Sequence, residues 1–346
     1  MSSVVSRNPY TGEVVFSAVA AGRDEVNTKV GRAVAAAAGW AAAPTDERAA
    51  VLRRFADLVD SDAGELADLI VAEVGKLRSE ALGEVEWTAR SARYYADHPP
   101  AVDRRAGAVV RRRALGVVAA VTPWNVPLVT PAWKWLPAVM AGNAVVWKPS
   151  ELASATAMAA VERLTRAGLP AGVVVPVLGG AETGQAVCAD PRVQGITFTG
   201  STQAGRTIAM LAAQRFVPCA LEMSGINVAV VFSDADLDLA VDCVAGASTA
   251  INGTEVHSDA PGPRAATRRP RVRRSPGTTL RGATSGRPVA GADHAGPPDL
   301  SCRQRTGTGG GDSRAAQRRP CRRPDSRPSG RPGGLPGDAA DRPVIR

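Results

Sequence analysis

The fold is decided by residues 116–151, which read GVVAAVTPWNVPLVTPAWKWLPAVMAGNAVVWKPSE. Two short β-branched runs lie in this stretch, GVVAAVT at 116–122 and NAVVWKP at 143–149. Each run is almost continuously apolar, which is typical of a strand in a sheet that is covered on both faces. The stretch therefore predicts two strands of a buried parallel sheet.

The same pattern continues toward the C-terminus. Three further strand-like runs are VVVPVLG at 173–179, QGITFTG at 194–200 and INVAVVF at 226–232. The Ala-rich segments with helical periodicity between them are residues 154–168, 182–190 and 202–214. Strands that alternate with helices predict βαβ units, so we expect a doubly wound α/β domain.

Helices are expected on either side of this domain. Residues 24–98 are Ala-rich, with apolar residues recurring at three and four, and predict amphipathic helices with Asp and Ser caps between them. Residues 234–251 predict one more helix, for which Asp234 or Asp236 would be the N-cap.

The composition changes after Gly253. Residues 254–346 contain 19 Arg, no Lys and 8 acidic residues, a formal charge of +11 against +9 for the whole chain, so residues 1–253 carry −2. The last aromatic residue is Phe232, and 13 of the 26 prolines lie after residue 260. Such a segment cannot bury enough apolar surface to offset its conformational entropy. We expect an ordered domain over 1–253 and a disordered Arg/Pro/Gly-rich tail over 254–346.

Several classes of protein are excluded by the same survey. No apolar run approaches the roughly 20 residues that span a bilayer, and the N-terminus lacks a signal-peptide pattern. The five cysteines are odd in number and lack CxxC pairs, so they indicate neither a disulfide framework nor a metal site. We expect a cytoplasmic protein.

Two loops that follow predicted strands carry polar residues suited to a nucleotide. In ITFTGST, Gly200 and Ser201 precede a helix, where backbone N–H groups and a hydroxyl suit a phosphate; alternatively, Ser201 or Thr202 simply caps that helix. In WKPSE, Lys148 and Glu151 could hold the two hydroxyls of a ribose, or could form a solvated surface pair.

Two further segments carry residues suited to catalysis. Glu222 interrupts an apolar run, so it either meets a cation or faces a cavity in which a raised pKa makes it a general base. Asn125, beside Trp124 and between two prolines, could point a rigid amide donor at an oxyanion, or could be a turn residue that satisfies backbone groups.

In this order, TPWNVP, AGNAVVWKPSE, AGLPAGVVVPVLG, ITFTGSTQAGRTI and LEMSG resemble the aldehyde dehydrogenase superfamily. The resemblance extends back through NPYTGE and EVGKLRSEA, so it covers residues 8–252, and it leans toward the branch that acts on semialdehydes such as 2-oxoglutarate semialdehyde. The family binds NAD or NADP in an α/β domain without GxGxxG, a motif that is absent here, and it forms homo-oligomers.

The resemblance implies a role for each candidate residue. Lys148 and Glu151 would hold the adenosine ribose, with Glu151 favouring NAD. Gly200 and Ser201 would hold the pyrophosphate, and Trp124 would contact the cofactor.

The resemblance also implies a covalent mechanism. Asn125 would contribute to the oxyanion hole and Glu222 would be the general base. A cysteine thiolate would attack a small-molecule aldehyde, hydride would pass to the nicotinamide, and a base-activated water would hydrolyse the thioester.

The sequence departs from the family at the nucleophile. The family's cysteine lies in a Gly-Gln-x-Cys motif that should fall near residue 256, where this chain has Thr254, Glu255, Val256 and His257. Codons GGG ACA GAA GTG CAC AGC GAC GCG CCG are allowed for residues 253–261, and from their second base they encode Gly-Gln-Lys-Cys-Thr-Ala-Thr-Arg. We therefore hypothesise a frameshift near codons 252 and 253, after which the residues carry no selected function.

Three functions compete on this basis. The first is an aldehyde dehydrogenase by descent that cannot oxidise its substrate, and the second is a nucleotide-binding pseudoenzyme. The third uses the Arg-rich tail to bind nucleic acid, against which the absence of lysine and aromatic residues from the tail argues. A membrane partner is not expected. A further departure is Ser224 where the family has Gly, which could strain the backbone or crowd the nicotinamide.

Overall fold

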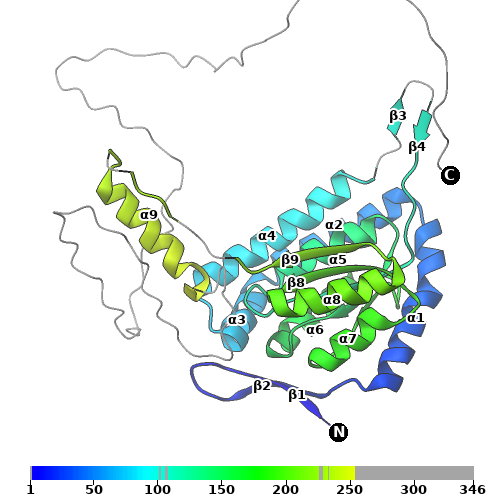
Figure 1. Cartoon of the computed structure of the whole chain (residues 1–346), viewed down its shortest axis with the longest axis horizontal. Coiled ribbons are helices and arrows are strands. Elements are labelled where there is room, and N and C mark those ends of the chain that lie inside the picture. The colour runs from blue at the N-terminus through cyan, green and yellow to red at the C-terminus, as the bar shows by residue number, and fades with distance from the viewer. Residues whose placement is uncertain (1, 101–102, 106–107, 226–228, 233, 254–346) are drawn as a thin grey trace, which may run out of the picture. The chain divides into compact units, whose positions relative to one another are not determined.

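The strands predicted from residue 116 onward form one parallel sheet (Figure 1). The computed structural model describes residues 2–100, 103–105, 108–225, 229–232 and 234–253. Within these residues the sheet has five strands in the order β7-β6-β5-β8-β9. Their bounds are Val117–Val121 for β5, Ala144–Lys148 for β6, Val174–Pro176 for β7, Val193–Gly200 for β8 and Cys219–Met223 for β9.

The sheet is doubly wound, as the alternation of strands and helices predicted. The chain runs through β5, β6 and β7 in one direction and then crosses back to β8 and β9. Helices α5 (Val129–Met140) and α6 (Ser154–Arg166) contribute to one apolar core, and α7 (Ala181–Ala189) and α8 (Thr202–Arg215) contribute to the other. The strand order therefore reverses between β5 and β8, and such a reversal is where open α/β sheets bind ligands.

The predicted N-terminal helices are present and extend both cores. Their bounds are Arg23–Ala42 for α1, Thr45–Ser61 for α2, Ala63–Val74 for α3 and Arg78–Asp97 for α4. Phe55 of α2 meets Trp135 of α5 edge to face, with ring centroids 5.3 Å apart. Val26 and Val30 of α1 belong to the other core. These helices therefore pack against the elements that cover the sheet and enlarge both cores.

The expected Asp and Ser caps between these helices are wrong. None of α1 to α4 has a side-chain hydrogen bond from its N-cap residue. Asp62 occupies the N-cap position of α3, but its carboxylate accepts instead from Arg163, at 3.1 Å, and from Arg166, at 3.0 Å. An ion pair between distant helices has replaced the local cap.

The strand predicted at residues 226–232 is not found in its described part. Ala229–Phe232 has no regular secondary structure, and residues 226–228 lie outside the described residues. The edge strand is β9, the Cys219–Met223 run that contains Glu222. Val230 and Phe232 are 69% and 70% exposed, because no neighbouring strand covers them in the described part of the chain.

Several elements were not predicted. Helix α5 carries Pro131 and Pro137, which hide its periodicity. Two antiparallel hairpins join β1 (Ser3–Arg7) to β2 (Val14–Val19) and β3 (Asp103–Arg105) to β4 (Ala108–Val110).

The last predicted helix is confirmed as α9 (Leu237–Thr249), followed by the short η2 (Ala250–Gly253). Of the two candidate caps the structure selects Asp236, whose side chain accepts from Asp238 N and Leu239 N, both at 3.1 Å. No residue of α9 is buried. The disorder expected for 254–346 lies outside the described residues. Within them, no helix combines the length and the apolar character that a membrane crossing requires.

Candidate functional site

The candidate residues lie at the carboxyl edge of the parallel sheet, although they are spread over about 100 positions of the chain. Trp124 and Asn125 follow β5, and Lys148 ends β6. Gly200 ends β8, and Glu222 is the penultimate residue of β9. Because parallel strands end together, the fold brings four separate sequence motifs to one edge.

The strand register shows how closely these ends are aligned. Val121, the last residue of β5, pairs with Lys148 on one side and with Phe198 on the other. Glu222 pairs with Thr199 on the neighbouring strand. The β5 and β8 loops thus flank the point at which the strand order reverses.

Lys148 and Glu151 form the pair that the sequence suggested. Lys148 Nζ donates to Glu151 Oε2 at 3.3 Å, and Glu151 opens the short helix η1 (Glu151–Ala153). Lys148 is only 7% exposed, and its stem lies against α7, where a Cβ added at Gly184 would lie 3.6 Å from Lys148 Cδ. This is not a solvated surface pair, because only the carboxylate end is open to solvent.

Ser201 is the N-cap of α8. Its hydroxyl accepts from Ala204 N at 3.2 Å, so the capping alternative describes the structure as it stands. A Cβ at Gly200 would lie 2.7 Å from Phe198 Cζ, so a side chain at this position would displace the ring beneath it. Glycine therefore lets the turn pack against this ring, and the turn leads into the N-terminus of α8, where backbone N–H groups suit a phosphate.

A polar atom that the sequence did not single out lies beside this turn. Thr199 Oγ1 is buried and has no hydrogen-bond partner among the described residues. A buried hydroxyl normally has a partner, so an orphaned one at this edge suits a ligand that brings a hydrogen-bonding group. Together with the small Gly200 and the Lys148–Glu151 pair, it fits the donors and acceptors of a nucleotide.

The loop that carries Trp124 and Asn125 is tied to the neighbouring strand. Trp147 Nε1 donates to Thr122 Oγ1 at 2.9 Å, and Thr122 N donates to Lys148 O at 3.2 Å. Trp124 and Asn125 are half-buried. These two hydrogen bonds tie the end of β5 to the end of β6. The loops that follow the two strands therefore keep a constant position relative to each other.

Glu222 is not buried as its apolar surroundings in the sequence suggested. It lies on the edge strand β9, and its side chain is exposed in the described part of the chain. A cation does lie near it: burial lowers the pKa of Lys134, and the negative charge of Glu222 opposes that shift. Lys134 belongs to α5, which the sequence did not reveal as a helix. Of the two alternatives, the structure supports the cation.

Ser224 does not carry the backbone strain that the comparison with glycine suggested. Among described residues other than glycine, positive φ occurs at Phe216 and Ile251. Ser224 N donates to Gly200 O at 3.3 Å, and Thr202 Oγ1 donates to Ser224 O at 3.5 Å. The residue therefore connects the end of β9 to the turn before α8.

Of the described cysteines, Cys188 and Cys219 lie away from the carboxyl edge. The apolar helical pattern around Cys243 in the sequence favours a buried thiol, but Cys243 is exposed, because α9 has no covering layer in the described residues. Cys188 is buried in α7, where desolvation raises the pKa of its thiol to about 12. Cys219 begins β9, at the opposite end from Glu222, and burial raises its pKa. Cys302 and Cys321 lie outside the described residues. Among the described residues, no cluster of His, Cys, Asp or Glu could hold a metal ion.

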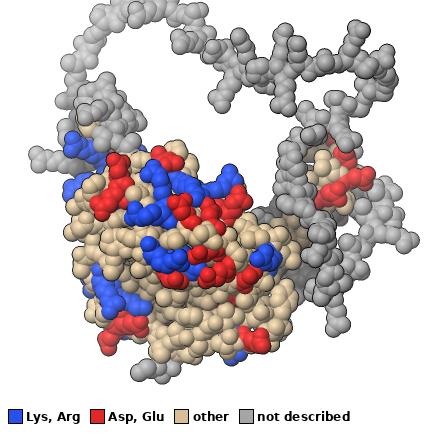
Figure 2. Space-filling model, turned by 180° about the vertical axis from the view of Figure 1, so that it is seen from behind, with Lys and Arg blue, Asp and Glu red and all other residues tan. Residues whose placement is uncertain are grey.

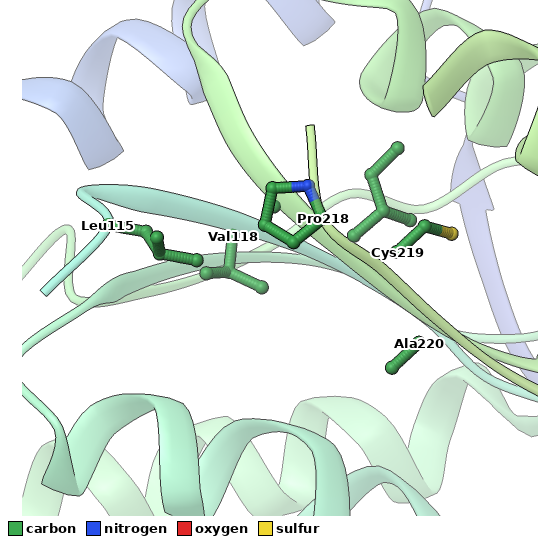
Figure 3. A pocket seen from close by; sticks show the side chains of 7 residues that line it. Leu115, Val118, Pro218, Cys219 and Ala220 are labelled. Atoms are coloured by element: carbon green, nitrogen blue, oxygen red, sulfur yellow. The ribbon is translucent and has the colours of Figure 1, made fainter. Parts of the chain in front are cut away.

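An apolar pocket of about 280 Å³ lies elsewhere on the sheet (Figure 3). It is lined by Leu115, Val118, Gly195, Ile196, Pro218, Cys219 and Ala220. These residues lie toward the amino ends of β8 and β9, whereas Gly200 and Glu222 lie at the carboxyl ends. Its lining offers no charged group, so it is not the site of the chemistry considered above.

Comparison with known proteins agrees with this geometry. Residues 2–256 match the aldehyde dehydrogenase family. Over 245 residues the chain is 41% identical to mitochondrial succinate-semialdehyde dehydrogenase of Arabidopsis thaliana, covering 68% of this chain and 46% of that protein. Over 248 residues it is 40% identical to 3,6-anhydro-alpha-L-galactose dehydrogenase of Streptomyces coelicolor, covering 69% and 50%.

Solved structures show the same similarity. A mutant of aldehyde dehydrogenase C from Pseudomonas syringae, in complex with NAD+ and octanal, superposes with a TM-score of 0.71 at 33% identity, covering 74% of this chain and 54% of that one. The chain spans about half the length of the curated relatives that it matches. The matched residues include every candidate site residue, and the chain belongs to the aldehyde dehydrogenase family over residues 2–256.

Proposed function

We propose that this chain binds NAD or NADP at the carboxyl edge of its sheet, between the loops that follow β5 and β8. The observation that carries the proposal is the convergence of the four motifs at the reversal of strand order. Lys148 and Glu151 would hold the adenosine ribose, and Gly200 and Ser201 would lie against the pyrophosphate. The bound cofactor would supply the hydride acceptor.

The substrate class that fits this family is an aldehyde or a semialdehyde. Two of the matched relatives are succinate-semialdehyde dehydrogenases, which favours a semialdehyde. Asn125 would donate to the oxyanion, Glu222 would act as the general base, and Trp124 would contact the cofactor. A homo-oligomer is the assembly that the family resemblance favours.

We further propose that this chain binds the cofactor without oxidising an aldehyde. Thr254, Glu255, Val256 and His257 stand where the family has its cysteine motif. Cys188 cannot replace that cysteine, because its thiol is buried and protonated at neutral pH. The frameshift hypothesis accounts for both the missing nucleophile and the change in composition. Sequencing the DNA around codon 253 tests it, since codons that cannot encode Gly-Gln-Lys-Cys in the second frame would end it.

Cofactor binding is tested by titrating the full chain with NAD+ and NADP+ in a calorimeter. Lys148→Ala should weaken binding roughly tenfold or more, because a charge-assisted hydrogen bond contributes about 1.5–3 kcal/mol. Arg53→Ala is a suitable control, since Arg53 forms an exposed pair with Asp97 on the N-terminal helices. If wild type and Lys148→Ala bind equally well, the site assignment is wrong.

A further inference from the structure

The segment EVGKLRSEALGE, residues 73–84, contains three glutamates whose roles the catalytic assignment leaves unexplained. It runs from the end of α3 into α4, outside the sheet. Each of these glutamates nevertheless accepts a hydrogen bond from the backbone of a distant segment. Those segments are the starts of α6 and α5 and the chain just before residue 254.

Glu73 caps helix α6. Its Oε1 accepts from Ala155 N at 2.7 Å, and its Oε2 accepts from Thr156 N at 2.8 Å and from Thr156 Oγ1 at 2.7 Å. The residue at the N-cap position, Ala153, has no side chain that could do this. A carboxylate supplied by α3 therefore satisfies the first-turn N–H groups of the helix that follows Lys148 and Glu151.

Glu84 does the same for helix α5. Its Oε1 accepts from Leu128 N at 2.7 Å and from Val129 N at 3.1 Å, and its Oε2 accepts from Lys76 Nζ. The N-cap residue Leu128 offers no polar side chain. The side chains of Lys76 and Glu84 are each only 3% exposed. This buried pair thus supports the helix that follows Trp124 and Asn125.

The third glutamate reaches the region where the family's nucleophile would lie. Glu80 Oε1 accepts from Ile251 N at 2.7 Å. Glu80 Oε2 is buried and has no hydrogen-bond partner among the described residues. The three glutamates lie within twelve consecutive residues, and two of them, Glu73 and Glu84, contact helices that follow loops of the site.

We propose that Glu73 and Glu84 are positioning residues for the cofactor site. Glu73 holds the loop after β6 and Glu84 holds the loop after β5, each through the helix that follows that loop. The inference rests on the proposed cofactor function. Each loop is short and is fixed at its first end by a strand of the sheet. The glutamate fixes the other end of each loop. Both loops are therefore held in place by the same α3–α4 segment.

The energetics favour positioning over simple stability. A Ser or Asp at Leu128 or Ala153 would cap its helix locally without burying charge. Burying an ion pair instead carries a desolvation penalty that its own attraction need not repay. What the remote glutamates add is a fixed distance between the two loops and the N-terminal helices.

The connection itself is pinned to the N-terminal hairpin. Gly75 has φ +73°, and Tyr10 Oη donates to Gly75 O at 3.1 Å. Pro9 packs so closely that a Cβ at Gly75 would lie 2.6 Å from Pro9 Cγ. The NPYTGE segment, which also had no catalytic role, therefore packs against the turn between α3 and α4 that carries Lys76, the partner of Glu84.

Hydrogen exchange on the full chain tests the positioning directly. Glu73→Met should speed exchange of amides 154–157 roughly five- to tenfold, the effect of losing a cap, and should leave amides 128–130 unchanged. Lys76→Met/Glu84→Met should do the reverse. Lys76→Met/Glu84→Gln keeps an acceptor for Leu128 N and Val129 N without the ion pair, so it should stay close to wild type at amides 128–130.

Ligand binding supplies a readout that general destabilisation would not move. AMP probes the adenosine end, and NAD+ probes the whole cofactor. Glu73→Met should weaken both ligands by a similar factor, whereas Lys76→Met/Glu84→Met should weaken NAD+ and leave AMP within about twofold. Glu86→Gln, on the same helix but with a 66% exposed side chain, should change neither.

Equal loosening of both loops in every variant, or no loosening in any, would overturn the proposal. If wild type binds neither AMP nor NAD+, the proposed cofactor function fails. The exchange data still decide the positioning claim in that case, because they need no ligand.

Discussion

Lys134 and Glu222 show how much of this site depends on contacts between distant residues. The sequence placed Glu222 in an apolar run, and its charge could be explained by a cation or by a cavity. The structure supplies the cation from α5, about 90 positions earlier in the chain. Thr199, Glu73 and Glu84 are comparable, because their roles follow from packing that no local pattern reveals. Residues at strand ends, such as Lys148 and Gly200, could be predicted because parallel strands end at one edge.

Lys134 gives a pH-dependent prediction. Burial lowers its pKa in the folded state, so the unfolded state binds the proton more tightly. The side chain then lowers stability at every pH below its folded-state pKa, and this penalty disappears as the pH rises from that value toward the usual 10.5. Lys134→Met should raise the melting temperature at pH 7, and its advantage over wild type should shrink at alkaline pH.

Melting curves of the two proteins between pH 6 and pH 10.5 measure this difference. Lys29→Met, at a half-buried lysine that pairs with the exposed Glu25, shows how much of the change comes from removing any lysine. A Lys134→Met protein that is less stable at pH 7, or whose advantage grows with pH, would contradict the assigned cause.

Elements were predicted well where one local pattern decided them and poorly where neighbours did. Strands β5 to β8 and helices α6 to α8 follow from apolar runs and helical periodicity. Helix α5 escaped because its two prolines conceal the period, although Glu84 supplies the cap that it lacks. The apolar run at 226–232 has strand composition, yet Ala229–Phe232 forms no strand, because pairing requires a neighbour that composition cannot provide.

The turn between α3 and α4 can be tested with two glycines. Gly75→Ala should destabilise the chain by about 1–3 kcal/mol, because φ is positive there and the new Cβ would meet Pro9. Gly83→Ala, inside α4 with open space around it, should stabilise by roughly 0.5–1 kcal/mol. Urea denaturation measures both changes. A Gly75→Ala protein that is as stable as wild type would show that the turn does not impose its backbone conformation.

At the scale of the whole molecule, the described residues form an aldehyde dehydrogenase family domain whose surface keeps several exposed apolar side chains. Val230, Phe232 and the apolar residues of α9 are exposed in the described part of the chain. The face seen in Figure 2 carries positive and negative side chains interspersed, which gives no surface of one sign for nucleic acid. The basic balance of the chain comes from residues 254–346, so composition alone overstated how basic the folded part is.

The exposed apolar residues should make the protein prone to association. The full chain should bind a fluorescent apolar dye and should associate as its concentration rises. Val230→Ser/Phe232→Ser should reduce both effects more than Val14→Ser/Val19→Ser, a control at two exposed residues of β2. Monodisperse protein with a cooperative melt and no dye binding would contradict this expectation.

The most direct test of the central claim combines cofactor binding and turnover in one sample. The full chain is titrated with NAD+ to saturation, a semialdehyde such as succinic semialdehyde is added, and NADH absorbance is followed. We predict saturable binding of about one NAD+ per chain and no aldehyde-dependent NADH above a protein-free control. NADH formation that needs both the aldehyde and the protein would show that the chain holds a working nucleophile, and an absence of NAD+ binding would show that the carboxyl edge of the sheet is not a cofactor site.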